Sequence, residues 1–410
     1  MAQVRYVISI VICMLFSAGL IAAQHDDLYI HGGTIYTMAG NPIEDGVIRV
    51  EDGKITYVGR RLKIPPDALT LDATGKVITP GFILAFSHLG MNSQQQSDVK
   101  ESPITPGYRA LDIVNLEDPG FAEARTHGIT SVNIMPPDER PVPGVGVVMK
   151  TGGVDFRKRI VKNPSALSIN LVASYQPYKN FRGIGFSSEV ADIIALRSRL
   201  NEAKKYRNGK QNTDANNSTS LPELHDSMFL KAINQEIPVM ITAESPTEIE
   251  RGLSLAEDFD FKPIFVGVHS IENLWSRFNS HYRYLVVESA INNSTSSELS
   301  PISDEILMQL FERNFHPQIA IDESGYEGTG AVRYYPLQAS ILQRLGVSLE
   351  TALKTLTVYP AEMLNLQDKL GTIEVGKDAD LIIFNEGPLT IHALPDFVII
   401  DGQIISEGRR

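Results

Sequence analysis

The chain has 410 residues, of which 43% are hydrophobic and 21% are charged, and its formal net charge at pH 7 is −12. This length and composition are typical of a globular protein with a core large enough for one α/β barrel and a small second domain. The acidic balance provides no electrostatic footprint for nucleic acid, so we expect no nucleic-acid partner.

The N-terminal segment predicts export. Arg5 precedes an apolar run that ends at Phe16, and the small pair Ala22-Ala23 offers a cleavage site. We therefore expect a signal peptide over residues 1–24 and a periplasmic or secreted protein; an uncleaved N-terminal anchor is the alternative, although the run is short for a bilayer-spanning helix. Cys13, the one cysteine, lies in this segment, so the mature chain would have no disulfide framework and no cysteine-based zinc site.

Both ends of the chain have the pattern of β-hairpins. Short apolar strands fill residues 28–58, with turn residues between them at sites such as His31-Gly32-Gly33. Residues 379–384 and 396–400 form a similar pair of strands that ends in the turn Asp401-Gly402. Two strand-rich ends around an α/β middle predict that the termini meet in one small β-sandwich.

The middle of the chain alternates apolar strand-like runs with amphipathic helical stretches, as βα units do. The eight candidate strands are 78–86, 129–135, 145–149, 168–174, 238–243, 264–269, 284–288 and 317–322. The helical patterns lie near 118–127, 187–206, 224–234, 246–257, 302–313, 333–346 and 349–356. Eight strands within about 280 residues predict a (β/α)8 TIM-like barrel. We therefore expect an α/β fold with a barrel at 78–361 and a composite β-sandwich domain at 25–77 and 362–410.

Four segments carry motifs of a known family. Residues 47–55 match its opening hairpins, and residues 371–381 match its G-x-I-x-x-G-K-x-A-D-L segment. Residues 353–361 follow its A-x-T-x-N-P-A helix with Tyr359 in place of Asn, and residues 78–88 follow its strand V-T-P-G-F-I-D-A-H-S-H. The chain thus resembles the amidohydrolase superfamily, particularly its secreted branch related to imidazolonepropionase and to metal-dependent prolidases, over nearly the whole mature length.

The resemblance implies a metal site at the C-terminal mouth of the barrel, with His side chains from strands one, five and six and an Asp from strand eight. Imidazoles and carboxylates hold Zn²⁺ while leaving room for a water whose pKa falls to about 7. Among these positions the chain keeps His88 on strand one, His269 on strand six and Asp322 on strand eight. Asp322 would be the catalytic proton acceptor.

Other positions of the implied site are replaced. Phe86 occupies the first His position of strand one, and Leu84 occupies the Asp position before it. Thr242 stands at the His position of strand five, and Glu244 follows two residues later on the same face of the strand. Strand four offers no lysine for the carbamylated bridge of binuclear members, and Lys150, at the end of strand three, could be only a distant substitute.

These replacements lead to a first functional hypothesis. The chain would be an exported amidohydrolase-like protein that has lost most of its metal ligands and acts as a non-catalytic or partner subunit. It would bind no metal and would form a homo-oligomer, or a hetero-oligomer with an active homologue. A small-molecule ligand or substrate is compatible with the mouth of the barrel.

Two alternatives remain open. The first is a metal-dependent hydrolase of C–N bonds other than linear peptide bonds, in a cyclic amide or a small dipeptide. It would use a reduced mononuclear Zn, Fe or Mn site of His88, His269, Glu244 and Asp322. The second is metal-free hydrolysis with Asp322 as base and His88 or His269 as acid. That reaction would lack the carbonyl polarisation that a metal ion supplies.

Overall fold

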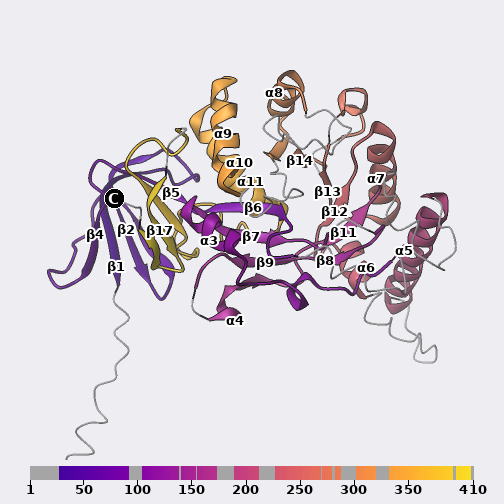
Figure 1. Ribbon diagram of the computed structural model, residues 1–410, viewed down its shortest axis with the longest axis horizontal. Coiled ribbons are helices and arrows are strands. Elements are labelled where there is room, and N and C mark those ends of the chain that lie inside the picture. The colour runs from indigo at the N-terminus through magenta and orange to yellow at the C-terminus, as the bar shows by residue number, and fades with distance from the viewer. Residues whose placement is uncertain are drawn as a thin grey trace, which may run out of the picture.

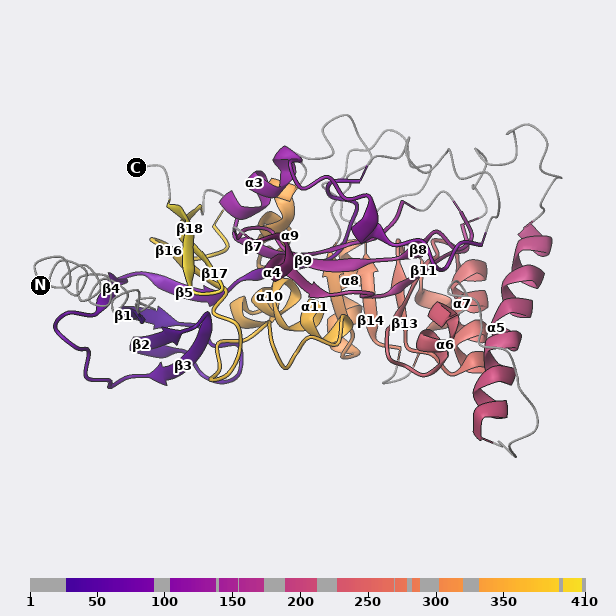
Figure 2. The same ribbon diagram turned by 90° about the horizontal axis from the view of Figure 1, so that it is seen from below.

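The computed structural model describes a subset of the chain, namely residues 27–91, 104–137, 140–153, 155–172, 189–211, 227–268, 270–278, 282–287, 302–319, 332–390 and 394–407. The molecule is elongated, with a β-sheet built from both ends of the chain at one end of its long axis (Figure 1). An α/β part fills the remainder, and helix α5 (Glu189–Gln211) lies at the opposite end (Figure 2).

The terminal sheet has eight strands in the order β18-β17-β16-β5-β1-β2-β3, and β4 pairs with β1. Its strands are β1 (Leu28–Ile35), β2 (Ile43–Glu51), β3 (Lys54–Gly59), β4 (Leu69–Asp72), β5 (Val77–Pro80), β16 (Leu381–Phe384), β17 (Pro395–Ile400) and β18 (Gln403–Glu407). Strand β5 pairs with β1 on one side and with β16 on the other. The two ends of the chain therefore meet, as their hairpin patterns predict, but they do so in one sheet, and the predicted β-sandwich is not confirmed.

The turns of this sheet show one correct and one wrong prediction. Asp401 and Gly402 have φ values of 48° and 74°, the left-handed conformation that a tight turn between β17 and β18 requires. The predicted turn at His31-Gly32-Gly33 is wrong, because β1 continues through these residues. Its register against β2 shifts on both sides of Gly33, and Gly32 has a φ of 86°. Such irregularities bend a strand without ending it.

The α/β part contains two further sheets, with strand orders β10-β9-β7-β6 and β15-β14-β13-β12-β11-β8. Their strands are β6 (Phe82–Ser87), β7 (Ile129–Ile134), β8 (Gly144–Val145), β9 (Val147–Lys150), β10 (Ile160–Lys162), β11 (Leu167–Asn170), β12 (Val239–Thr242), β13 (Pro263–Val266), β14 (Tyr284–Val287) and β15 (His316–Ile319). The strands from β11 to β15 pair in parallel, as do β6 and β7. However, β9 is antiparallel to β7, and β8 is antiparallel to β11.

Each predicted strand of the barrel overlaps an observed strand, but the sheets differ from the prediction. The region 78–86, expected as one strand, is divided at Gly81 between β5 of the terminal sheet and β6. The region 145–149, expected as one parallel strand, is split into β8 and β9 around Gly146 and runs antiparallel to its neighbours. The two sheets are mixed, and neither closes on itself through strand pairs of the described residues. The fold is α/β.

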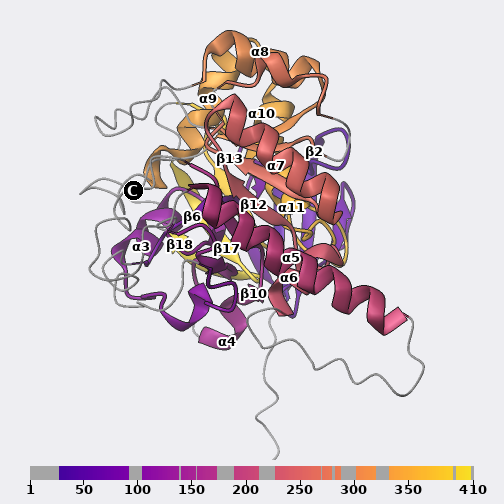
Figure 3. The same cartoon turned by 90° about the vertical axis from the view of Figure 1, so that its right-hand side faces the viewer.

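The helices are α3 (Pro119–Thr126), α4 (Phe156–Arg159), α5, α6 (Ser227–Ile233), α7 (Pro246–Phe259), α8 (Asp304–Glu312), α9 (Tyr335–Arg344), α10 (Leu349–Leu356) and α11 (Val358–Met363). The seven predicted helical stretches correspond to α3 and to α5 through α10 to within a few residues, whereas the short helices α4 and α11 were not among them. Figure 3 shows α5, α7 and α8 along the outside of the α/β part. Among the residues that the structure describes, no helix combines the length and apolar composition needed to cross a bilayer.

Strand β16 joins the terminal sheet to the α/β part because both of its faces are buried. Leu381 and Ile383 belong to the core of the terminal sheet, whereas Ile382 and Phe384 belong to the core of the α/β part. The ring centroid of Phe384 lies 6.2 Å from that of Phe82 in β6. Alternate residues of a strand point to opposite faces, so a strand with two buried faces needs a continuous apolar run.

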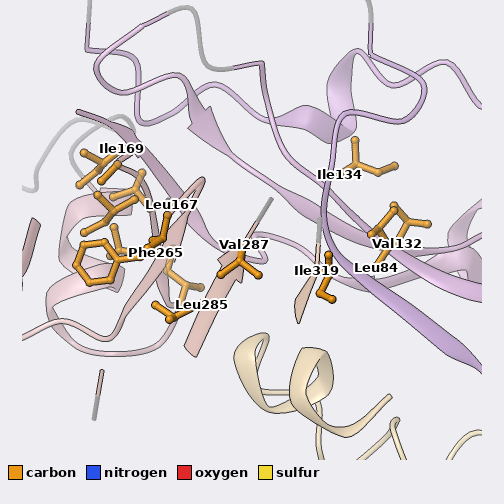
Figure 4. Packing of buried hydrophobic residues seen from close by; sticks show 14 of the residues in the cluster. Leu84, Val132, Ile134, Leu167, Ile169, Phe265, Leu285, Val287 and Ile319 are labelled. Carbon is orange, nitrogen blue, oxygen red and sulfur yellow. The ribbon is translucent and has the colours of Figure 1, made fainter. Parts of the chain in front are cut away.

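The strands of the α/β part separate two apolar clusters by the same alternation. The outer cluster packs against the helices; the strand residues that Figure 4 labels in it are Leu84, Val132, Ile134, Leu167, Ile169, Phe265, Leu285, Val287 and Ile319. The inner cluster contains the intervening strand residues Ile83, Ala85, Val148, Met240, Ile264, Val266, Tyr284 and Val286, together with residues of α11 and the segment after it. Strands of both sheets contribute to the inner cluster.

Candidate functional site

His88 directly follows β6, at the end of the strand where the sequence predicts a metal ligand. The register between β6 and β7 is irregular between Leu84 and Ser87, so three steps along β6 match two along β7. This bulge changes the alternation of side chains. Leu84 is fully buried in the outer cluster, while Phe86 packs against the inner cluster. Leu84 therefore does not line the mouth of the predicted barrel.

The ring of His88 is held in one orientation. Its Nδ1 lies 2.9 Å from the carbonyl oxygen of Met135. A carbonyl oxygen can only accept a hydrogen bond, so Nδ1 carries the proton and the lone pair lies on Nε2. The Phe86 and His88 rings meet edge to face, with their centroids 5.1 Å apart. Phe86 thus supplies a hydrocarbon edge or face where the superfamily has a second imidazole.

Thr242 and Glu244 lie at the end of β12. The carbonyl oxygen of Thr242 accepts a hydrogen bond of 2.9 Å from the backbone N–H of Leu171, which continues the pairing with β11. A capping box at the start of α7 holds the backbone of Glu244, because Oε2 of Glu248 accepts from the N–H groups of Glu244 (2.9 Å) and Ser245 (3.0 Å). The sequence S-P-T-E at 245–248 is the pattern that encodes this box.

The side chain of Glu244 lies beside the end of β13. A Cβ atom on Gly267 would lie 3.4 Å from Cγ of Glu244. Gly267 has a φ of 80°, which favours glycine and turns the chain just after β13. Thr242 and Glu244 therefore lie at the edge of the six-stranded sheet where β13 also ends.

Lys150 does not lie at this edge of the strands, because β9 runs antiparallel to β7. Lys150 pairs with Ser131 near the start of β7, whereas Val147 pairs with Ile134 at its end. His88 follows the end of β6, which is parallel to β7. Lys150 and His88 consequently lie at opposite ends of these strands, and the prediction of Lys150 as a distant substitute for a bridging lysine is wrong.

The ammonium group of Lys150 belongs to a buried ion cluster. Its Nζ lies 2.5 Å from Asp380, 3.0 Å from Asp378 and 3.3 Å from Asp401, and its side chain is 2% exposed. Burial alone would lower the pKa of Lys150, but the three carboxylates together raise it above its usual value. The lysine therefore stays charged and ties β9 to the start of β16 and to the turn after β17.

Two of the predicted site residues, His269 and Asp322, lie outside the described residues. Within the described ranges, no three side chains of His, Cys, Asp or Glu come together closely enough to hold a metal ion. The described part of the predicted site thus consists of His88, Glu244, Phe86 and Thr242.

Comparisons with known proteins agree with the fold and with the motifs. A family model described as "Amidohydrolase family" matches residues 334–406. The chain is similar to a solved amidohydrolase structure from Thermotoga maritima, with a TM-score of 0.81, 26% identity, and coverage of 93% of this chain and 100% of that one. The chain belongs to the amidohydrolase superfamily.

Two curated relatives of this amidohydrolase-superfamily protein are more distant. It is 22% identical over 409 residues to amidohydrolase tasK of Hapsidospora irregularis, and 22% identical over 378 residues to imidazolonepropionase of Kosmotoga olearia. The alignments cover 87% and 82% of this chain. The chain spans 39% of the length of the first relative and 83% of the second.

A polar network inside this superfamily member was not predicted from its sequence. The N–H of Ala85, in the bulged part of β6, donates to Oε1 of Gln318 (2.9 Å), and its carbonyl oxygen accepts from Nδ2 of Asn133 (2.8 Å). Nε2 of Gln318 and the hydroxyl of Tyr335 donate to the carbonyl oxygen of Ile83, at 2.9 and 2.7 Å. Burial raises the pKa of the Tyr335 hydroxyl. A glutamine within an apolar strand, H-P-Q-I, is the sequence feature that could have revealed the network.

One of the described residues has the chemistry that a metal ligand of this superfamily needs, and two others do not. The hydrogen bond to Met135 gives His88 the tautomer that a metal-ligating imidazole needs, with its second nitrogen held by a carbonyl oxygen. Phe86 has no donor atom, and Thr242 presents a hydroxyl where an imidazole would stand. Of the pair of positions expected at the end of strand one, the described residues thus provide one imidazole, that of His88.

Proposed function

We propose that the two sheets of the α/β part are the two arcs of one (β/α)8 barrel. Gly146 separates β8 from β9 and exchanges hydrogen bonds with Ser165 (2.9 Å) and Ala166 (3.0 Å), which supports continuity between the sheets. Gln318 bridges β15 to β6 through Ala85 and Ile83, in place of a strand ladder. The shared inner cluster fits the packed interior of such a barrel. A crystal structure with water between β6 and β15 would contradict this arrangement.

Within that barrel, we propose a protein without a catalytic metal centre that acts as a non-catalytic or partner subunit. The observation that carries this proposal is the contact between the rings of Phe86 and His88. It supports a mouth in which an aromatic ring occupies the space beside the retained histidine. An oligomer with a second copy or with an active homologue, and export directed by residues 1–24, belong to the same proposal and rest on the sequence.

Metal analysis of the purified chain is the direct experiment. We expect much less than one equivalent of zinc, iron or manganese after expression in metal-supplemented medium. We also expect no rise in melting temperature on addition of Zn²⁺, because an ion that binds the native state must stabilise it. One equivalent of tightly bound metal that is lost in an Asp322→Ala variant would overturn the proposal.

A variant that is expected to gain zinc binding provides a more specific test. Phe86→His restores a second imidazole beside His88, so we expect it to bind Zn²⁺ more tightly than the wild type does. Phe86→Leu is the matched control, because it removes the same ring without adding a nitrogen donor. Equal zinc affinity of the two variants would show that Phe86 is not the feature that keeps the ion out.

A second candidate function is favoured by the orientation of His88. With its Nδ1 proton held by Met135, the imidazole has the form that binds a metal ion. A reduced mononuclear site that includes His88 and Glu244 would support hydrolysis of a C–N bond in a cyclic amide or a small dipeptide. Hydrolysis of imidazolonepropionate or of Xaa-Pro dipeptides, abolished in both His88→Ala and Glu244→Gln, would establish this function in place of the first.

A further inference from the structure

A second group of charged side chains lies at the end of the α/β part where strands β13, β14 and β15 begin. We call it the basal cluster, and it consists of Lys162, Lys262, Arg283, His316 and Glu362. Lys162 ends β10, Lys262 and Arg283 directly precede β13 and β14, and His316 begins β15. Glu362 belongs to α11, which packs against these strands in the inner cluster.

The two lysines converge on the end of α11. Nζ of Lys162 donates to the carbonyl oxygen of Leu364 at 2.7 Å. Nζ of Lys262 donates to the carbonyl oxygen of Glu362 and to Oδ1 of Asn365, both at 3.0 Å. These bonds satisfy carbonyl groups at the C-terminal end of a helix, where cations are favourable. They also bring two ammonium groups to one small surface.

Glu362 provides the one carboxylate of the basal cluster. The Oε2 atom of Glu362 lies 2.8 Å from Nδ1 of His316, 3.3 Å from the hydroxyl of Tyr284 and 4.0 Å from Nη2 of Arg283. The cluster thus contains three basic side chains besides His316 and one carboxylate, so positive charge is in excess when both lysines are protonated.

The neighbouring carboxylate does not remove this excess. Glu350 lies near enough to Tyr359 to affect its pKa. However, Oε1 of Glu350 is paired with Nζ of Lys354 at 2.6 Å, so that pair adds no net charge.

The guanidinium of Arg283 has unused hydrogen-bonding capacity. Its Nε is buried and has no hydrogen-bond partner among the described residues. A buried donor without a partner costs about 1–3 kcal/mol relative to a satisfied one. The side chain as a whole is 30% exposed, so other atoms of the guanidinium side chain are open to solvent although Nε is not.

The pKa values of both lysines are lowered, mainly by burial. Burial lowers the pKa of Lys162 to about 8. Burial also lowers the pKa of Lys262 to about 8, against the attraction of Glu362 and with added repulsion from Lys162 and Arg283. An anion bound between these groups would relieve the repulsion.

Aromatic rings border the cluster. Tyr359, the residue that replaces Asn in the superfamily motif, stacks on His316 with ring centroids 4.1 Å apart and an interplanar angle of 13°. Nζ of Lys262 lies 4.5 Å from the ring centroid of Tyr284. These rings hold the charged groups in place and give the surface flat apolar walls.

We propose that the basal cluster binds a multiply charged oxyanion of the phosphate type, at the end of the strands opposite to His88. Lys162, Lys262 and Arg283 supply the charge, and Arg283 supplies N–H donors from a side chain that is 30% exposed. Glu362 excludes a second anion and orients His316. This site is independent of the proposed function at the other end of the strands.

The experiment uses the full chain and inorganic phosphate, with sodium chloride adjusted to constant ionic strength. We expect the melting temperature to rise with phosphate concentration in a saturable manner, as it must for a ligand of the native state. Phenyl phosphate forms a second arm. Tighter binding than inorganic phosphate would identify a phosphate ester whose ring contacts the aromatic wall, and equal binding would identify the free ion.

The variants locate the site. Lys262→Met and Arg283→Gln should each weaken phosphate binding at least tenfold, and Arg283→Gln keeps the result interpretable if Lys262→Met fails to fold. Lys204→Met is the matched control. Lys204 also donates to a carbonyl oxygen near a helix end, that of Asp258 at 2.8 Å, and its Nζ lies 5.8 Å from the ring centroid of Phe259. No phosphate-dependent shift in the wild type, or an equal loss in Lys204→Met, would overturn the proposal.

Discussion

Replacement of Lys150 by methionine should destabilise the protein more than any substitution of a surface charge. The variant keeps the length of the side chain and removes the cation between Asp378 and Asp380. Both carboxylates are themselves largely buried, with side chains 11% and 5% exposed. Removal of one partner of a buried ion pair leaves an uncompensated charge and costs about 3–5 kcal/mol.

The matched control is Lys54→Met. Nζ of Lys54 pairs with the same Asp378, but its side chain is 47% exposed. An ion pair of this kind contributes about 0.2–1 kcal/mol. Both variants remove a lysine from Asp378, so the difference between them reports the burial of Lys150 together with its contacts to Asp380 and Asp401.

Urea unfolding gives the measurement. Trp275, the one tryptophan of the chain, lies in the α/β part with its ring centroid 5.7 Å from that of Phe315, so its fluorescence reports on that part. Far-ultraviolet circular dichroism reports on the whole chain. We expect Lys150→Met to lower the urea midpoint by both probes, and Lys150→Met/Asp380→Asn to recover part of the loss.

The pH dependence provides a further check on this cluster. Burial raises the pKa of Asp378, but Lys150 and Lys54 outweigh it and hold the pKa below its usual value. The stabilisation from this carboxylate is therefore present above its unfolded pKa and is lost as the pH falls through the lower, folded value. A Lys150→Met variant within about 1 kcal/mol of the wild type at pH 7 would refute the role of burial on which this reasoning depends.

Three other predictions concern the remaining contacts. Gln318→Leu should cost about 1–3 kcal/mol, because it leaves the buried N–H of Ala85 unsatisfied, whereas Gln309→Leu at a half-buried position of α8 should change little; equal urea midpoints would argue against the bridge. The free energy of unfolding should rise as the pH increases from about 8 to 10.5, because Lys162 and Lys262 bind fewer protons in the folded than in the unfolded chain; a Lys162→Met/Lys262→Met variant with an unchanged slope would contradict this. Ser245→Ala should cost about 0.5–2 kcal/mol through the N-cap of α7, and an unchanged midpoint would show that the capping box does not contribute.

The sequence alone determined the elements and much of their order. Alternating and helical apolar patterns located the strands of the two central sheets except β10, and gave β8 and β9 as one strand, because burial of one face or both depends on local residue spacing. The tight turn at Asp401-Gly402 followed from residues that tolerate positive φ. The substitution of Phe86 beside His88 was also readable, since a phenyl ring cannot bind a metal in any fold.

Only the tertiary structure decided where particular side chains point. The antiparallel course of β9 put Lys150 at the end of the strands opposite to His88, and the bulge in β6 brought Phe86 against the inner cluster, although Leu84 two residues earlier faces the outer one. Strand direction and register arise from pairing between distant segments, so they leave no mark on the spacing within one strand. The same applies to Lys150 and Asp380, which are 230 residues apart in the chain and 2.5 Å apart in the fold.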